Sequence, residues 1–199
     1  MKKRLVKPFR PAYPSPAALV TSVSEDGRPN IITLGEVFNI SIGIGAQPVI
    51  LGIAIAKSRY SHQLITATRE YVVNFATSRM VETVDLCGTV SGRDVDKFRD
   101  FQLTPVPAAK VRPPLIGECP LNVECRVLSI QEVGDHDLFL GEVLAEHVAE
   151  EALDQDGRIL VDKLDFLCYL HNEYWSCGQR LGRHGFSHRK GEPCDAGNS

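Results

Sequence analysis

The sequence predicts a mainly β protein, a small β-barrel with short peripheral helices. Apolar runs rich in Val and Ile come in pairs joined by short polar turns, which is the pattern of antiparallel hairpins. Helical spacing of apolar residues occurs only in short stretches between these runs. Long hairpins with short intervening helices favour a barrel over a parallel α/β sheet. With 199 residues, 43% of them hydrophobic, the chain is expected to fold as a single domain.

The first half of the chain alternates between apolar runs and one short helical stretch. A β-branched run ends at Asp26-Gly27, a dipeptide that suits a tight turn because Gly accepts positive φ, and a second run follows as in a hairpin. After a further, almost wholly apolar run, Ser58 offers an N-cap to a helix. The expected strands lie at 17–24, 29–40 and 48–56, and the expected helix at 59–69.

The second half contains a longer hairpin. Gly88 is expected to end a short helix, and the alternation of the longest run shifts near Leu128, which predicts a β-bulge. The proline-rich stretch 103–120 is expected to be a surface connection. Strands are expected at 71–75, 120–133, 138–149 and 165–170, a helix at 79–87, a loop entering a short helix at 91–98, an N-terminal extension at 1–16 and a Gly/Arg-rich tail at 178–199.

Composition and missing motifs exclude several functions. A net charge of −3 without a long basic stripe gives no general attraction to nucleic acid or to anionic membranes. The basic N-terminus is broken by prolines and lacks an apolar core, unlike a signal peptide, and no run reaches the about 18 apolar residues of a membrane helix. We therefore expect a cytoplasmic protein.

The six cysteines show no C-x-x-C spacing, so reduced thiols and no metal site are expected. Walker A, Rossmann, H-E-x-x-H and G-x-S-x-G patterns are absent.

One polar stretch, AKSRYSH at 56–62, has the composition of an anion site. If a strand ends before it and a helix starts within it, the free N–H groups of the first helical turn point to one place, where the helix dipole favours negative charge. Ser58 and Ser61 add hydroxyl donors, and Lys57 and Arg59 add positive charge, which together suit one phosphate. The alternative is an N-capped helix whose two cations are only solvated.

Four segments in one order resemble the flavin reductase-like, FMN-binding split-barrel family that includes the flavoredoxins. They are AKSRYSH, YVVNF, DLCGTVSGRDVDKF and GDHDLFLGEV, and the likeness extends from about residue 13 to residue 187. The resemblance implies a Greek-key split barrel that forms a homodimer with FMN at the subunit interface. It also implies that the phosphate binds at Lys57, Ser58, Arg59 and Ser61, and that the isoalloxazine edge rests on Thr33, Leu34, Gly35, Glu36, Ala54 and Ile55.

The resemblance assigns further contacts in three other segments. Asn74 would make a polar contact with the flavin, although it could equally be a strand residue that faces solvent. His136 would face the nicotinamide or the open flavin face, or else it is an ordinary histidine at a hairpin tip. The segment 181–190 could fold over the same face or remain a flexible basic terminus. The loop that reaches the flavin, often that of the partner subunit, would contribute Ser91, Lys97 and Phe98.

One residue departs from the family pattern. Glu36 stands where many relatives carry an aromatic or apolar residue beside the ring. A carboxylate there would disfavour the anionic reduced flavin and lower its potential, unless the side chain points into solvent.

The expected function is that of an FMN-dependent oxidoreductase that uses NADH or NADPH, such as a flavin reductase. Hydride transfer to a flavin needs orientation and charge rather than a catalytic triad, which agrees with the missing motifs. A second hypothesis is a flavoredoxin-type electron carrier that receives electrons from a partner protein. A third is a split-barrel binding module that has lost its flavin.

Overall fold

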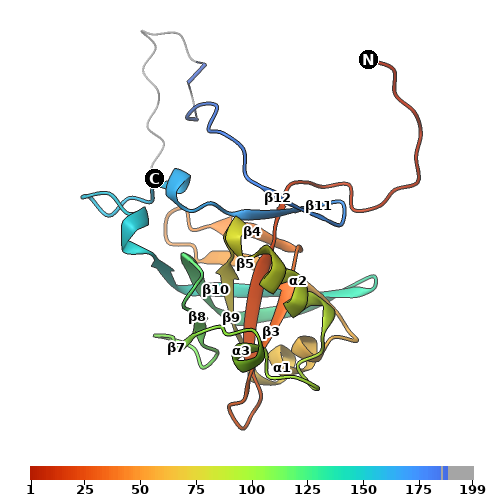
Figure 1. Cartoon of the computed structure of the whole chain (residues 1–199), viewed down its shortest axis with the longest axis vertical. Coiled ribbons are helices and arrows are strands. Elements are labelled where there is room, and N and C mark those ends of the chain that lie inside the picture. Colours follow the sequence, from red (N-terminus) through yellow and green to blue (C-terminus); the bar gives the residue numbers. More distant parts are fainter. Residues whose placement is uncertain (185, 188–199) are drawn as a thin grey trace.

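The computed structural model describes residues 1–184, 186 and 187, and its centre is one antiparallel sheet of seven strands (Figure 1). The strand order is β3-β2-β6-β9-β10-β5-β4, and the mainly β, split-barrel class that the sequence predicts is confirmed. The strands are β2 (Ala18–Val23), β3 (Pro29–Leu34), β4 (Val37–Ile42), β5 (Val49–Ala56), β6 (Glu70–Phe75), β9 (Leu121–Val133) and β10 (His136–Val148).

The sheet curls around a core to which all seven strands contribute. Tyr71 and Phe139 are its largest members, and both side chains are fully buried. The Tyr71 hydroxyl donates to the Leu51 carbonyl across the barrel at 3.2 Å. Gly141 is required beside it, because a Cβ at that position would lie 2.2 Å from the same hydroxyl.

Short helices cover the outside of the barrel, as expected (Figure 1). A second apolar cluster, which includes Leu19, Ile31, Val84 and Phe98, lies between them and β2 and β3. The helices are α1 (Tyr60–Thr68), α2 (Val81–Thr89) and α3 (Lys97–Asp100), with 3-10 turns η1 (Ser78–Met80), η2 (Glu150–Ala152) and η3 (Val161–Lys163). Within the described residues, none of the helices has the length and apolar composition to cross a membrane.

Two small sheets complete the fold. The hairpin of β11 (Leu167–Leu170) and β12 (Glu173–Ser176) pairs with β1 (Ser15–Pro16), and β7 (Pro105–Val106) pairs with β8 (Leu115–Ile116). β12 lies beyond the last strand that the sequence pattern indicated. The N-terminal extension is exposed through residue 14, and from residue 178 onward no helix or strand is found among the described residues.

The structure corrects four local predictions. The run at 29–40 breaks at residues 35–36, so that β3 pairs with β2 and β4 pairs with β5. Arg59, not Ser58, is the N-cap residue of α1, and no side chain caps that helix. Gly88 lies inside α2, where the lack of a Cβ lets Thr33 approach. The stretch 103–120 buries Leu103, Val111, Leu115, Ile116 and Cys119 and so belongs to the core. The bulge at Leu128 is confirmed, because its two neighbours pair with adjacent residues of β10.

Candidate functional site

Two adjoining cavities lie where the β3, β5 and β10 ends meet α1, α2 and the β11–β12 hairpin. We call the first, of about 220 Å³, the cationic cavity, and the second, of about 330 Å³, the aromatic cavity. Both are lined by Ile32, Arg59, Gly88 and Thr89, so they form one continuous depression. The volume of the aromatic cavity alone lies in the range of small-molecule and cofactor sites, about 300–1,000 Å³.

The cationic cavity is built by the two loops that precede α1 and α3. Its lining contains no acidic residue. The first turn of α1 lies against it without a side-chain cap, so its free N–H groups remain available to a ligand. The serine and cationic residues of the lining are Ser58, Ser61, Ser91, Arg59, Arg93 and Lys97. Three of the four residues predicted to bind an anion, Ser58, Arg59 and Ser61, line this cavity, and Arg93 lines it with them.

Lys97 is buried at the floor of this cavity, with 5% of its surface exposed. Its Nζ donates to the carbonyls of Ile31 and Cys87 at 2.7 and 2.6 Å, which leaves one of the three ammonium hydrogens for a ligand. Burial lowers the pKa of Lys97, and the charge of Arg59 lowers it further. An anion in the cavity would counteract both effects, because an opposite charge favours the charged form of the amine.

Asn30 and Gly92 form another part of the cationic cavity. Asn30 donates from Nδ2 to the Ser61 hydroxyl at 2.7 Å, and its Oδ1 is buried without a partner. A Cβ at Gly92 would lie 1.8 Å from that Oδ1, so glycine is required there. The unpartnered oxygen can accept a hydrogen bond from a ligand hydroxyl, which would remove the cost of its burial.

The aromatic cavity has main chain on one side and two tyrosines on the other. Thr33, Leu34, Gly35 and Glu36 line it from the end of β3, as expected, and a Cβ on Gly35 would lie 3.0 Å from the Tyr169 ring. Glycine at 35 thus lets the β11–β12 hairpin pack closely. The Tyr174 hydroxyl donates to Asp85 at 3.1 Å, and its pKa is raised by burial and by that carboxylate.

Glu36, Arg10 and His136 also line the aromatic cavity. Glu36 forms an ion pair with Arg10 at 2.6 Å, so its charge is compensated locally. His136 begins β10 and lines the cavity, and its Nδ1 lies 2.8 Å from Asp135. This hydrogen bond to His136 lowers the pKa of Asp135. His136 is therefore a partly exposed residue of the cavity wall and not only a turn residue.

The structure does not bring four predicted residues into the site. Lys57 turns away and binds Glu132 at 2.5 Å and Asp137 at 3.6 Å, on the outer side of the β9–β10 hairpin. Phe98 packs in the cluster beneath α2. Ala54 and Ile55 lie further down β5, where Ile55 points into the barrel core and the Ala54 N–H donates to the Glu36 carbonyl at 3.0 Å. Ala56 takes their place in the cavity lining.

Asn74 does not line the candidate site either, because its side-chain amide makes all of its hydrogen bonds to other parts of the protein. Its Nδ2 donates to the carbonyls of Leu19 and Val72, and its Oδ1 accepts from the Ile116 N–H and from Asn122. The side chain is completely buried, so the alternative of a strand residue that faces solvent is wrong.

Sequence reasoning missed several lining residues. Arg93 lies within the segment DLCGTVSGRDVDKF, and its positive charge was a local signal for an anion site. Asp85 begins the same segment, whereas Tyr169, Tyr174, Arg10 and Asn30 enter the site only through tertiary contacts, which no local pattern reveals. The described part of the tail, at 181–184, 186 and 187, lines neither cavity, and the rest of the predicted lid at 185 and 188–190 lies outside the described residues.

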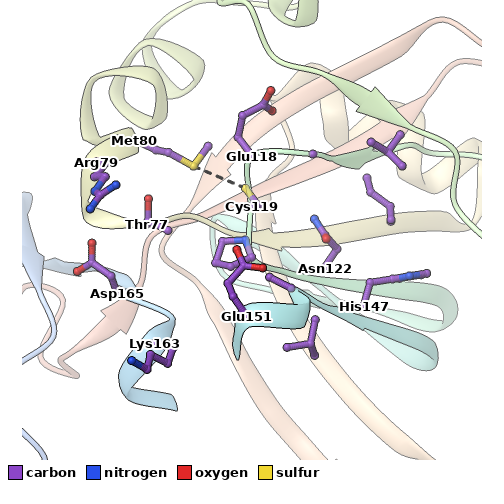
Figure 2. Close-up of a pocket in the computed structure, with 16 residues that line it drawn as sticks. Thr77, Arg79, Met80, Glu118, Cys119, Asn122, His147, Glu151, Lys163 and Asp165 are labelled. Carbon is purple, nitrogen blue, oxygen red and sulfur yellow. Dashed lines mark hydrogen bonds between the residues drawn. The ribbon is translucent and has the colours of Figure 1, made fainter. Parts of the chain in front are cut away.

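A larger cavity, of about 670 Å³, lies elsewhere on the molecule (Figure 2). It shares no residue with the site described above, and none of the predicted site residues lines it. Figure 2 shows charges of both signs in its lining, Arg79 and Lys163 together with Glu151 and Asp165. Such a mixed lining gives no preference for an anion, so the two adjoining cavities remain the candidate site.

Known proteins resemble this chain over most of its length. The family model of the flavin reductase like domain matches residues 10–176. An uncharacterized protein of Archaeoglobus fulgidus is 38% identical over 158 residues, which are 79% of this chain and 85% of that protein. The flavoredoxin of Desulfovibrio vulgaris (Miyazaki F) superposes with a TM-score of 0.85 at 30% identity, over 94% of this chain and 99% of that one. An NADH:riboflavin 5'-phosphate oxidoreductase of Streptomyces pristinaespiralis is 27% identical over 127 residues, 64% of this chain and 67% of that protein.

Proposed function

This chain belongs to the flavin reductase like domain family, and from that membership we propose that its two adjoining cavities bind FMN and that it is an FMN-dependent oxidoreductase. One observation carries the proposal: three cations, three serine hydroxyls and an uncapped helix N-terminus surround a space without carboxylates. This donor set suits a phosphate monoester. Because the aromatic cavity continues past Arg59, the pair fits a molecule with a phosphate at one end and a flat ring at the other.

The described residues fit FMN at both ends. Arg59, Arg93 and Lys97 would hold the phosphate, and the unpartnered oxygen of Asn30 would accept from a ribityl hydroxyl. The ring would lie in the aromatic cavity, between the main chain at the end of β3 and the tyrosines of the β11–β12 hairpin.

When bound, FMN would take a hydride from NADH or NADPH at N5 and supply electrons to an acceptor such as free flavin or a protein. The protein contributes position and charge. His136, held by Asp135, would orient the nicotinamide at the open side of the cavity. Tyr174, which donates to Asp85, would keep one wall of the cavity fixed. The likeness to an NADH:riboflavin 5'-phosphate oxidoreductase supports this hydride donor.

The second candidate is a flavoredoxin-type electron carrier, in which a partner protein delivers the electrons. The close superposition on a flavoredoxin favours it. The two candidates differ in one measurable step, the reaction of the flavin-loaded protein with a nicotinamide. In a stopped-flow mixing experiment, prompt bleaching of the flavin absorbance by NADH or NADPH supports the reductase. Absence of bleaching, with dithionite reduction intact, supports the carrier.

The visible spectrum of the purified protein tests the cofactor itself. We expect a two-banded flavin absorbance that survives gel filtration. A colourless protein that fails to take up added FMN would overturn the proposal and leave the split-barrel binding module.

We also propose that the protein is a homodimer with FMN at the interface. The support is an exposed apolar surface on β4, the turn after it and the start of β5, at the edge of the main sheet. Exposed rows of this kind mark interaction sites in soluble proteins. The surface consists of Phe38, Ile40, Ile42, Ile44 and Val49, whose exposed fractions range from 40 to 71%.

A cytoplasmic location stays a prediction from the sequence.

A further inference from the structure

Two cysteines meet on the hairpin that forms one wall of the aromatic cavity. The Sγ atoms of Cys168, on β11, and Cys177, just after β12, lie 3.0 Å apart. The strand pairing explains the meeting: Cys168 stands opposite Trp175, and Cys177 follows two residues later on the same face. A hydrogen bond from the Cys177 N–H to the Phe166 carbonyl, at 3.3 Å, extends the pairing to this point.

The two sulfurs lie on the opposite face of the hairpin from the cavity. Tyr169 and Tyr174, which stand opposite each other in the register, line the aromatic cavity. Because successive side chains of a strand point to opposite faces, the neighbouring Cys168 points away from that cavity. A bond between the sulfurs would therefore change the rigidity of the wall without entering the site.

The two thiols differ in the way that thiol–disulfide exchange requires. Cys177 is exposed, so a dissolved disulfide can reach its sulfur. Cys168 is only 8% exposed, and burial together with Cys177 raises its pKa. An accessible sulfur that attacks first and a protected neighbour that attacks second are the two parts of such a reaction. The sulfurs need to approach by only about 1 Å to reach the length of an S–S bond.

We propose that Cys168 and Cys177 form a thiol–disulfide exchange site that reacts with small-molecule disulfides of the glutathione type. The Cys177 thiolate attacks the disulfide RSSR, forms a mixed disulfide and releases RS⁻, which takes up a proton. Cys168 then loses its proton and attacks the Cys177 sulfur, which expels the second RS⁻. Two protein thiols are oxidised by two electrons, and RSSR is reduced to two RSH.

The other described cysteines lack this arrangement. Cys87, Cys119 and Cys125 are buried, burial raises the pKa of each, and no second cysteine sulfur lies within hydrogen-bonding distance of any of them. Cys194 lies outside the described residues. The Cys194→Ser substitution therefore removes the one cysteine outside the described residues and keeps the other five cysteines.

The test counts thiols in the full-length Cys194→Ser protein. The protein is equilibrated with mixtures of reduced and oxidised glutathione, its free thiols are blocked with a maleimide, and intact mass and peptide mapping follow. We expect two thiols to be lost together, with one crosslink joining residues 168 and 177. In Cys168→Ala the glutathione adduct at Cys177 should persist, and in Cys177→Ser residue 168 should stay free.

Two results would overturn the proposal. One is a full set of free thiols in excess oxidised glutathione, which needs no variant and so does not depend on the folding of one. The other is a Cys177 adduct that persists in the parent protein as it does in Cys168→Ala. Amide hydrogen exchange measures the effect on the rigidity of the cavity wall. Oxidation should slow exchange in β11 and β12 at least tenfold. Equal exchange rates in the two redox states would refute the change in rigidity.

Discussion

Replacing Arg59 with alanine removes the cation that lies at the junction of the two cavities. A hydrogen bond to a charged group contributes about 1.5–3 kcal/mol, and each 1.4 kcal/mol changes an equilibrium constant tenfold. The dissociation constant of FMN should therefore rise by about 10- to 100-fold. Lys57→Ala is the matched control, because it removes a cation two residues away that is 45% exposed and bound to Glu132 and Asp137 instead.

The assay is titration of the flavin-free protein with FMN, followed by the quenching of flavin fluorescence at one fixed salt concentration. Lys57→Ala should leave the dissociation constant within about twofold, since an exposed ion pair outside the cavity contributes little. Circular dichroism shows whether both variants are folded. Equal losses in the two variants, or an unchanged affinity in Arg59→Ala, would refute the assignment of the cationic cavity as the phosphate site.

Four further predictions follow from the contacts described. Gly92→Ala places a Cβ 1.8 Å from Asn30 Oδ1, so it should lower the free energy of unfolding by about 1–3 kcal/mol in a denaturant titration. Glu36→Gln should raise the midpoint potential of bound flavin, because a negative charge near the ring disfavours its reduced anion. Burial alone would raise the pKa of Glu124, but hydrogen bonds from the Ala109 and Lys110 N–H groups and from His147 outweigh it and lower that pKa. The stability lost in Glu124→Gln should therefore be largest above the ordinary pKa of a glutamate and should disappear as the pH falls through the folded-state pKa. Ile40→Glu on β4 should convert the proposed dimer to a monomer in light scattering.

Three of these variants have a matched control variant, and the fourth is tested by its pH dependence. Gly178→Ala has open space around the added Cβ and should leave stability unchanged. Arg10→Gln should shift the potential downward, opposite to Glu36→Gln, and shifts of the same sign would show that the ion pair does not act on the ring. Val161→Glu, the control for Ile40→Glu, replaces an even more exposed apolar residue away from β4 and should leave the mass unchanged. A pH-independent difference for Glu124→Gln would contradict the linkage argument.

Local patterns located most strands because each has a periodicity that burial enforces. The turn at Asp26-Gly27 and the bulge at Leu128 could be read directly, since each is a short-range feature of one hairpin. β12 could not be read, because only one of its four residues is even half-buried and its pattern carries no apolar alternation. The break within 29–40 could not be predicted either. Both halves are apolar, and they separate because β3 pairs with β2 while β4 pairs with β5.

The sequence by itself determined the fold class and the cationic, hydroxyl-rich character of the loop before α1, because residues of these types at a strand-to-helix junction are a local property. The tertiary structure decided which of those cations faces the cavity. Lys57 and Arg59 are equivalent by composition, but Lys57 meets two carboxylates of the β9–β10 hairpin, while Arg59 lines the cationic cavity, which contains no carboxylate. It also brought Asn30, Tyr169, Tyr174 and the Cys168–Cys177 pair to their places. Those contacts join segments of the chain whose approach depends on the packing of the whole barrel, and no local pattern encodes that packing.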